Sequence, residues 1–410
     1  MADKPQEFDV IIVGGGPGGS TCATFCGKAG LKALLLEAGK FPRDKVCGDA
    51  ISGKSLGILR ELGIAQELEH TLHAKIKGVL LSSPNGSILE VPIPRAFKDR
   101  DSYGYCARRM VYDQFLFQHA KKFATALEEF RVTDLLKEGD QVVGVKGLDL
   151  KTNQPREFRS KVVVGADGAN SVVAAKTGLN KVDPKHSCIA LRAYYDGITG
   201  MKNLLEIHFV EEVLPGYFWI FPLENGLANV GVGMITHDLR KSNIKLEEAL
   251  NQVIESKLFK DRFAKAKLIA PIRGWTLPFG STHKKCYGNG FLLLGDAASL
   301  IDPFSGEGIG NAMTSGRTAV RIIKEAFGKN DFSEAFFRKY DEALWKEIGP
   351  ELRTSYMLQQ VGRRKFLLNA VISKSAKNKH LRDLISGMLV NEVPKKELYN
   401  PWFLLRVFFT

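Results

Sequence analysis

The stretch that decides the fold is Phe8-Asp9-Val10-Ile11-Ile12-Val13-Gly14-Gly15-Gly16-Pro17-Gly18-Gly19. Its first half is a short apolar run rich in β-branched side chains, which is typical of a buried parallel strand. Its second half contains the spacing G-x-G-x-x-G. Residues 20–30 then predict a helix, and residues 31–36 predict a second apolar strand that ends at Glu37. The order strand, helix, strand and acid predicts a βαβ unit that binds a dinucleotide.

Each glycine of the motif has its own physical task in such a unit. Gly14 lets the chain turn tightly, and Gly16 lets backbone N–H groups approach a pyrophosphate because no Cβ stands in the way. Gly19 lets the helix lie close to the strands. The helix N-terminus then offers free N–H donors and a favourable dipole to the phosphates. We expect Glu37 to accept hydrogen bonds from an adenosine ribose.

Two later strands of the sequence end in the same way. Residues 161–164 form an apolar run that leads to Asp167, and residues 290–294 form another that leads to Gly295-Asp296. A helix is expected to begin at Gly308-Ile309, so its N-terminal donors would face the same ligand. Asp167 alone is also compatible with an ordinary Asp-Gly turn. If one sheet joins the three strand ends, they form a single crevice for one extended dinucleotide.

The loop at residues 41–52 contains the cysteine of greatest chemical interest. Arg43 and Lys45 precede Cys47, and nearby cations would favour a thiolate. The alternative is a buried cysteine beside solvated charges, and composition alone favours that alternative.

Residues 189–232 alternate strongly and carry many aromatic side chains, which predicts several antiparallel strands. Tyr217, Trp219 and Phe221 alternate within them, so they would face the same side of one strand. Such residues are usually sheet core, but three on one face also suit the wall of an apolar tunnel. Trp275 is a further candidate for this substrate wall.

Length and charge restrict the classes of function. The chain has 410 residues and a net charge of +13, which predicts two or three domains and an anionic partner. No nucleic-acid module is recognisable, so we favour a membrane surface or an anionic substrate over nucleic acid. The six cysteines show no metal-ligand spacing. Residues 1–7 lack the apolar region of a secretory signal, so we expect a cytoplasmic protein. Peripheral attachment to the inner face of the cell membrane stays open.

The predicted architecture is α/β, with a discontinuous dinucleotide domain, an antiparallel-sheet substrate domain and C-terminal helices. The predicted dinucleotide domain comprises residues 1–75, 104–175 and 285–328. The predicted substrate domain comprises residues 76–103 and 176–284, and the C-terminal helical region comprises residues 329–410. The aromatic tail at residues 400–409 follows a basic helix. It is equally suited to a membrane surface and to docking on the protein's own core.

Together these motifs resemble those of flavoprotein hydroxylases with the glutathione-reductase-type FAD fold, and most specifically the geranylgeranyl reductase family. The residues that carry the likeness lie between Phe8 and Phe327. Beyond the three strand ends they are Phe41-Pro42-Arg43-Asp44-Lys45-Val46-Cys47-Gly48, Tyr217-x-Trp219-x-Phe221-Pro222 and Asp302-Pro303-Phe304-Ser305-Gly306-Glu307-Gly308-Ile309. The resemblance implies an enzyme that reduces double bonds of a geranylgeranyl-type chain on a lipid, quinone or related isoprenoid.

The resemblance also implies site residues. Arg109 matches a family arginine because it lies three residues before the pair Tyr112-Asp113, although Arg108 leaves this assignment open. Cys47, Tyr217 and Trp219 are the catalytic candidates, and Tyr217, Trp219, Phe221 and Trp275 are the substrate-binding candidates. The candidate contacts of FAD are Gly14, Gly16, Pro17, Gly18, Gly19, Glu37, Ala38, Cys47, Gly48, Ala50, Arg109, Asp167, Gly295, Asp296, Gly308 and Ile309.

The implied reaction transfers a hydride from reduced flavin to an alkene carbon, and whether Cys47 supplies the proton is open. No second G-x-G-x-x-G unit appears, so the expected electron donor is transiently bound NAD(P)H or a small redox protein. A flavin monooxygenase, a flavin halogenase and a flavin electron-transfer subunit at a membrane are the alternatives. Halogenases of this fold usually show Trp-x-Trp-x-Ile-Pro, whereas this chain has Tyr217 in place of the first Trp and Phe221 in place of the Ile, which favours the reductase. The sequence gives no indication of the oligomeric state.

Overall fold

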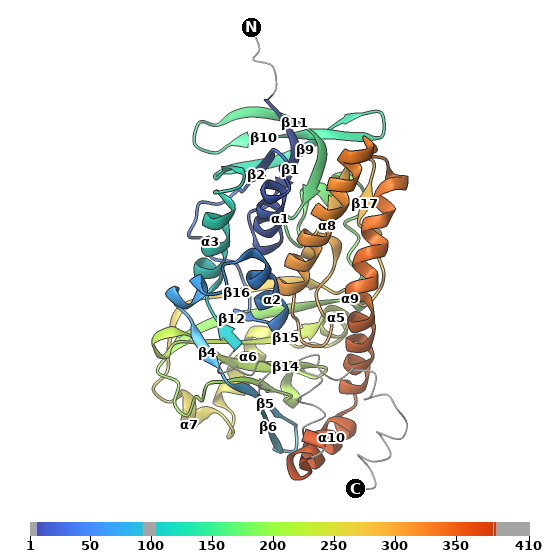
Figure 1. Cartoon of the computed structure of the whole chain (residues 1–410). Coiled ribbons are helices and arrows are strands. Elements are labelled where there is room, and N and C mark those ends of the chain that lie inside the picture. Colours follow the sequence, from blue (N-terminus) through green and yellow to red (C-terminus); the bar gives the residue numbers. More distant parts are fainter. Residues whose placement is uncertain (1–5, 93–103, 380, 383–410) are drawn as a thin grey trace.

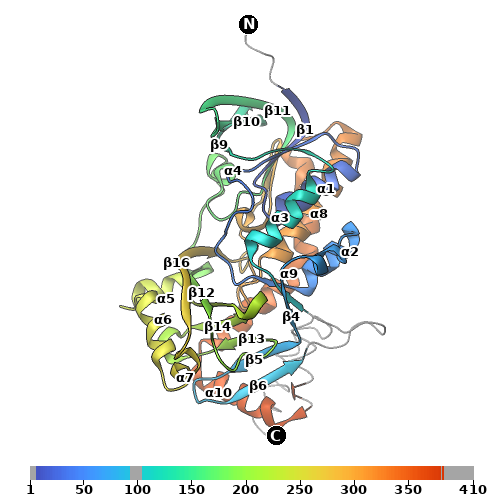
Figure 2. The same ribbon diagram turned by 90° about the vertical axis from the view of Figure 1, so that its left-hand side faces the viewer.

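The computed structural model describes residues 6–92, 104–379 and 381–382, and the strands of this part of the chain form three sheets. The molecule is elongated, with the first sheet near one end and the second near the other (Figures 1 and 2). Long helices run beside the first sheet, and α9 extends from that sheet toward the second (Figure 1).

The first sheet has eight strands in the order β17-β18-β11-β1-β2-β8, and β10 joins it by pairing with β11 and β9. Its strands are β1 (Gln6–Val13), β2 (Ala33–Leu36), β8 (Thr125–Leu127), β9 (Phe130–Glu138), β10 (Gln141–Asp149), β11 (Gln154–Gly165), β17 (Tyr287–Gly288) and β18 (Phe291–Leu293). The central strands β18, β11, β1, β2 and β8 are parallel. Their carboxyl ends therefore meet at one edge, where ligands of open α/β sheets bind.

The second sheet has seven strands in the order β16-β12-β15-β14-β13-β5-β6, and a small third sheet has the order β3-β7-β4. The strands of the second sheet are β5 (Gly78–Ser82), β6 (Ile88–Pro92), β12 (Ser187–Asp196), β13 (Leu204–His208), β14 (Gly216–Pro222), β15 (Ala228–Ile235) and β16 (Lys267–Pro278). Those of the third are β3 (Ala50–Ile51), β4 (Ala74–Ile76) and β7 (Gly104–Cys106). All pairs in the second sheet are antiparallel except β5 with β13.

The helices pack against both large sheets (Figures 1 and 2). They are α1 (Pro17–Lys28), α2 (Gly53–Leu62), α3 (Arg109–Ala120), α4 (Val172–Lys176), α5 (Thr236–Lys241), α6 (Leu246–Glu255), α7 (Lys260–Phe263), α8 (Ile309–Lys329), α9 (Glu334–Gly362) and α10 (Lys365–Lys377). In the described part of the chain, none of them combines the length and the apolar character needed for a bilayer crossing.

Close packing of α1 explains two of its glycines. A Cβ on Gly19 would lie 1.8 Å from the carbonyl oxygen of Gly14, so any side chain would push the helix off the strands. A Cβ on Gly18 would lie 3.1 Å from the carbonyl oxygen of Ala312 in α8. The tight turn at Gly14 has φ +103°, a conformation that favours glycine. The glycines at positions 18 and 19 therefore allow α1 to pack closely between the strands and α8.

The predicted α/β class is confirmed. The C-terminal helices predicted for residues 329–410 appear as α9 and α10, and α10 ends at Lys377. The aromatic tail at residues 400–409 lies outside the described residues. Helices α6 and α7 are separate because Ser256 adopts an extended conformation after α6.

Candidate active site

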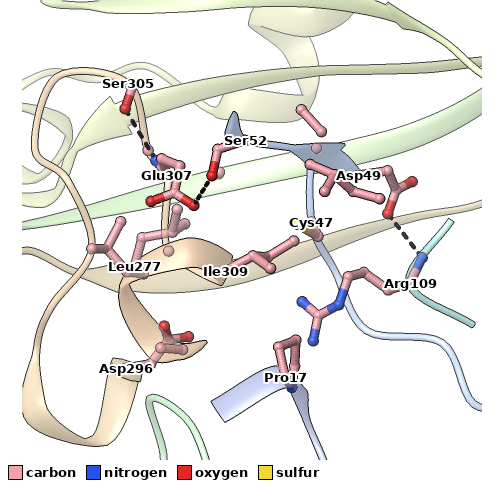
Figure 3. A pocket seen from close by; sticks show the side chains of 18 of the residues that line it. Pro17, Cys47, Asp49, Ser52, Arg109, Leu277, Asp296, Ser305, Glu307 and Ile309 are labelled. Atoms are coloured by element: carbon pink, nitrogen blue, oxygen red, sulfur yellow. Dashed lines mark hydrogen bonds between the residues drawn. The ribbon is translucent and has the colours of Figure 1, made fainter. Parts of the chain in front are cut away.

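A cavity of about 1720 Å³ lies between the carboxyl edge of the first sheet and one face of the second. Figure 3 shows part of its lining, in which side chains from α1, α8, the Cys47 loop and β16 face one another. Every predicted cofactor residue except Gly19 lines this cavity, together with all four predicted substrate residues. The structure thus brings three distant strand ends and the aromatic strand to one site. Gly19 lies outside the lining and serves the packing of α1.

The N-terminus of α1 is open toward the cavity and suits a phosphate group. No side chain caps its first turn. A Cβ on Gly16 would meet only guanidinium nitrogens, at 3.9 Å from Arg43 and 4.0 Å from Arg109. Free N–H donors and two guanidinium groups therefore surround the space in front of the helix, which is an anion-binding arrangement. The start of α8 differs, because the carboxylate of Glu307 accepts a hydrogen bond from the backbone N–H of Gly310 at 2.5 Å.

Glu37 is engaged by the protein itself. Its carboxylate accepts hydrogen bonds from the backbone N–H groups of Gly15 at 2.9 Å and Gly39 at 2.8 Å. It also accepts one from Arg43 Nε at 3.0 Å. Glu37 therefore orders the glycine turn, and its predicted contact with a ribose stays a prediction.

Arg43 connects two acidic groups of the site, a role that the sequence reasoning missed. Its guanidinium also donates to Asp113 at 2.9 Å, and Asp113 in turn accepts from Arg109 Nε at 2.5 Å. Burial alone would lower the pKa of Arg43, but the carboxylates of Asp113 and Glu37 raise it. Both guanidinium groups therefore stay charged beside the phosphate space.

Asp167 and Asp296 differ in how freely they face the cavity. Asp167 accepts from the backbone N–H of Val172 at 2.7 Å and from Ser171 Oγ at 2.5 Å, so its carboxylate stabilises the start of α4. Burial raises the pKa of Asp167. The Asp296 carboxylate pairs with Lys45 Nζ at 3.4 Å, and this ammonium lies 5.5 Å from the ring of Trp275. Lys45 was not among the predicted site residues.

The aromatic strand β14 forms one wall of the cavity. Tyr217, Trp219 and Phe221 face the same side, with ring centroids 5.9 Å apart for the first pair and 6.2 Å for the second. The hydroxyl of Tyr217 donates to the carbonyl oxygen of Ser305 at 3.0 Å, and burial raises the pKa of Tyr217. The tunnel interpretation of these residues therefore agrees with their placement.

Beyond β14 the cavity becomes aliphatic. Its far end is lined by Leu81 of β5, Val91 of β6 and residues of α10 that include Leu368 and Ile372. Leu368 and Ile372 are buried against β6, so α10 closes this end. An apolar passage with aromatic and aliphatic walls suits a long hydrocarbon chain.

Cys47 lies where the predicted cofactor residues and the apolar passage meet. Figure 3 places it between Ile309 and Arg109. Cys47 is partly exposed, whereas Cys22, Cys26, Cys106 and Cys286 are buried. The cations Arg43 and Lys45, which the sequence suggested as activators of the thiol, form ion pairs with Glu37, Asp113 and Asp296 instead.

A second polar cluster in the cavity was missed from the sequence. Ser52 Oγ donates to Glu307 Oε1 at 3.0 Å, beside the start of α8 (Figure 3). Lys54 Nζ donates to Asn311 at 2.6 Å and to Glu351 at 2.9 Å. Burial raises the pKa of Glu307. The motif around Glu307 was recognised only as part of a family signature, so the contacts of its side chain with Ser52 and Gly310 had no sequence signal.

Comparisons with known proteins agree with this geometry. The model of the FAD binding domain family matches residues 7–333. The digeranylgeranylglycerophospholipid reductase of Methanocaldococcus jannaschii is 33% identical over 87% of this chain and 87% of its own length. Digeranylgeranylglycerophospholipid reductase 1 of Methanococcoides burtonii is 30% identical over 87% of this chain and 84% of its own.

Solved structures extend the likeness to the whole fold. A geranylgeranyl bacteriochlorophyll reductase-like protein from Thermoplasma acidophilum superposes with a TM-score of 0.83 at 25% identity, over 97% of this chain and 100% of that one. A flavin-dependent brominase superposes with a TM-score of 0.76 at 24% identity, over 94% of both chains, and shares the fold. The domain match, the reductase relatives and the cavity between the two sheets agree: this chain belongs to the geranylgeranyl reductase family of FAD-dependent oxidoreductases.

Proposed function

We propose that this enzyme uses reduced FAD to saturate carbon–carbon double bonds in a geranylgeranyl-type chain attached to a glycerophospholipid or a related isoprenoid. The observation that carries the proposal is the continuity of one cavity from the open N-terminus of α1, past Cys47 and Trp219, to the aliphatic end below α10. The reductase relatives support the same substrate class.

The protein's contribution is alignment and exclusion of water. An isolated alkene is a poor hydride acceptor, so its carbon must be held close to the hydride donor in a dry site. Reduced flavin supplies the hydride when bound. Trp219 and Phe221 are at most 9% exposed and offer flat apolar surfaces to the chain. The hydride bonds to one alkene carbon, and the other carbon takes a proton, so each turnover adds one hydrogen pair.

Two groups are candidates for the proton source. Cys47 carries a thiol beside Ile309, and Glu307 carries a carboxyl group whose pKa burial raises. Of the two, Cys47 lies on the loop that continues toward the aromatic wall, which supports it as the direct donor. Loss of alkene reduction in a Cys47→Ser variant with normal flavin content would agree with this role, whereas full activity in Cys47→Ala would exclude it.

The test of the function is a product assay. Holoprotein reduced under anaerobic conditions is incubated with a digeranylgeranyl glycerophospholipid, and the lipid is examined by mass spectrometry. We expect gains of whole hydrogen pairs. A gain of oxygen or halogen after admission of air and halide would indicate one of the alternative chemistries. Flavin reoxidation without any change in the lipid would favour the electron-transfer alternative. The same assay with NAD(P)H or a reduced ferredoxin-type protein distinguishes the two proposed electron donors.

We further propose that α10 lies at a membrane surface, from which the prenyl chain enters. Phe366 is 61% exposed on this helix, and Arg364 and Lys377 add positive charge to it. An exposed aromatic ring beside cations suits an anionic lipid surface. Cosedimentation with vesicles that contain phosphatidylglycerol should be reduced in Phe366→Ser, and binding to neutral vesicles should be weak. Equal binding of the wild-type protein and Phe366→Ser to these vesicles would contradict the proposal.

A further inference from the structure

Asn229 of β15 is a fully buried amide that contacts three residues in two separate parts of the active site. It has 0% exposure. Its Oδ1 accepts from Trp219 Nε1 at 2.9 Å, and its Nδ2 donates to the carbonyl oxygen of Cys47 at 2.7 Å. The same Nδ2 donates to Asp49 Oδ2 at 2.8 Å. One side chain therefore connects the aromatic wall to both ends of the Cys47-Gly48-Asp49 segment.

The chemistry of the partners permits only one orientation of this amide. The indole nitrogen of Trp219 can only donate, so it requires the oxygen of Asn229. The carbonyl of Cys47 can only accept, and the Asp49 carboxylate also accepts when ionised, so both require the NH₂ group. All three bonds are buried, where an unmade hydrogen bond costs most. Asparagine supplies this set of one acceptor and two donors, and neither aspartate nor leucine does.

The segment Cys47-Gly48-Asp49, which is hydrogen-bonded to Asn229, also makes hydrogen bonds to other parts of the protein. Asp49 has φ +66° and is fully buried, and its Oδ1 accepts from the backbone N–H of Arg109 at 3.1 Å. Tyr194 of β12 donates to Asp49 Oδ2 at 2.8 Å. Arg192, also on β12, donates to Asp44 at 2.6 Å, so the loop before Cys47 is fixed to the same sheet. Asn229 is the contact within this set that reaches the backbone of Cys47 itself.

We propose that Asn229 is a positioning residue that fixes the Cys47 segment to the ring of Trp219, and thereby sets the thiol against a prenyl chain lying on that ring. The role of the prenyl chain rests on the proposed function, whereas the connection between Asn229 and Cys47 does not. Breaking the connection should free the backbone at Cys47 and expose its thiol.

The matched variant is Asn229→Asp, which keeps the shape and the acceptor for Trp219. Its second carboxylate oxygen would face the Cys47 carbonyl, which offers no proton, and the Asp49 carboxyl, with which it can share at most one, so at least one of the two bonds made by Nδ2 is lost. The control is Glu206→Gln, a substitution of similar size at a buried position of β13 in the same sheet. Glu206 contacts His208 and Arg262 and does not line the cavity. Any general loss of stability in this sheet should therefore appear in both variants.

The experiment measures alkylation of Cys47 by iodoacetamide in the FAD-loaded protein, with the modified peptide quantified by mass spectrometry. We expect Asn229→Asp to raise the alkylation rate of Cys47 about tenfold, as expected if roughly 1.4 kcal/mol of local restraint is lost. Cys188, the other partly exposed cysteine, should react at the wild-type rate. Glu206→Gln should leave both rates unchanged. Equal Cys47 rates in wild type and folded Asn229→Asp would overturn the proposal.

A second variant keeps the test usable if Asn229→Asp does not fold. Trp219→Phe removes the indole donor and keeps an aromatic ring, so it releases one of the three bonds; we expect faster Cys47 alkylation, and an unchanged rate would contradict the role of Trp219 in the connection. With the lipid substrate, Asn229→Asp should lower kcat more than it raises KM, because binding surface is kept while alignment is lost. If neither the wild type nor any variant reduces the lipid, but the alkylation rates change as stated, the proposed function fails and the positioning role of Asn229 stands.

Discussion

The indole ring of Trp219 occupies the space in which a side chain at Gly231 would begin. A Cβ on Gly231 would lie 2.3 Å from Cζ2 of Trp219 and 2.1 Å from the carbonyl oxygen of Leu191. The two residues are directly paired across β14 and β15. The aromatic wall therefore depends on a glycine in the neighbouring strand as much as on its own ring.

Gly231→Ala should displace Trp219 from the wall. The added methyl group has no room toward β12, so the ring or the strand must shift, at a cost of roughly 1–3 kcal/mol. We expect FAD content close to the wild-type value and a KM for the lipid that rises about tenfold. Steady-state kinetics and the flavin absorbance check both statements.

Gly233→Ala is the matched control on the same strand and face. Its Cβ would come no closer than 3.2 Å to Cys188 Sγ, so a small adjustment suffices. An unchanged KM in Gly231→Ala, or an equal rise of KM in both variants, would contradict the proposal that Trp219 contacts the substrate.

Val371→Trp should shorten the apolar passage. Val371 lies on α10 and lines the cavity at the end farthest from α1. A larger ring there would limit how far a prenyl chain can enter, so we expect products with fewer saturated double bonds and unchanged FAD content. Mass spectrometry of the lipid reports the distribution directly.

Phe366→Trp serves as the control, because Phe366 is on the same helix but exposed and outside the cavity lining. Complete saturation by Val371→Trp would mean that the chain does not reach α10.

Local patterns of the sequence were enough to bring the predicted cofactor residues to one end of the cavity, although their contacts with FAD stay a prediction. Gly14, Gly16 and Gly308 are recognisable because each lies at a strand end or helix start, and those positions are set by residues a few places away. Tyr217 and Trp219 share a face because strand geometry alternates side chains. In these cases a short stretch contains all the information that places the residue.

The residues that the sequence did not reveal acquire their roles from segments far apart in the chain. Asn229 lies in an unremarkable strand, and its partners Cys47 and Trp219 become visible only when loop and sheet are brought together. Arg43 was read as a neighbour of Cys47, but folding turns it toward Asp113, seventy residues away in the sequence. Spacing along the chain carries no signal for such contacts.

Protonation of the Glu206 carboxylate should lower the free energy of unfolding at acidic pH. Burial raises the pKa of its carboxyl, but hydrogen bonds and charge from Arg262 and His208 outweigh burial, and the net pKa is lowered. A lowered pKa means that the ionised group stabilises the fold above its ordinary pKa, and this contribution is lost as the pH falls through the folded value. Removing one partner of a buried pair typically costs about 3 kcal/mol.

Glu206→Gln should therefore be destabilised at pH 7, and its deficit relative to wild type should shrink below about pH 4. Urea unfolding at a series of pH values measures this difference. Glu248→Gln is the control, since Glu248 and its partner Lys245 are exposed and solvent screening leaves the pair little effect on stability. A deficit in Glu206→Gln that does not change with pH would contradict the assignment.

Asp49→Asn should remove a pH dependence of the free energy of unfolding whose sign is opposite to that of Glu206. Burial raises the pKa of Asp49 to about 6, although Asn229, Tyr194 and the charge of Arg192 oppose the shift. A raised carboxyl pKa means that the folded state binds the proton more tightly, so wild-type stability should fall as the pH rises from about 4 to about 6. The neutral amide cannot ionise, so urea unfolding of Asp49→Asn should lack this loss. If stability in both proteins changed in parallel between pH 4 and 6, Asp49 would not be the group that titrates.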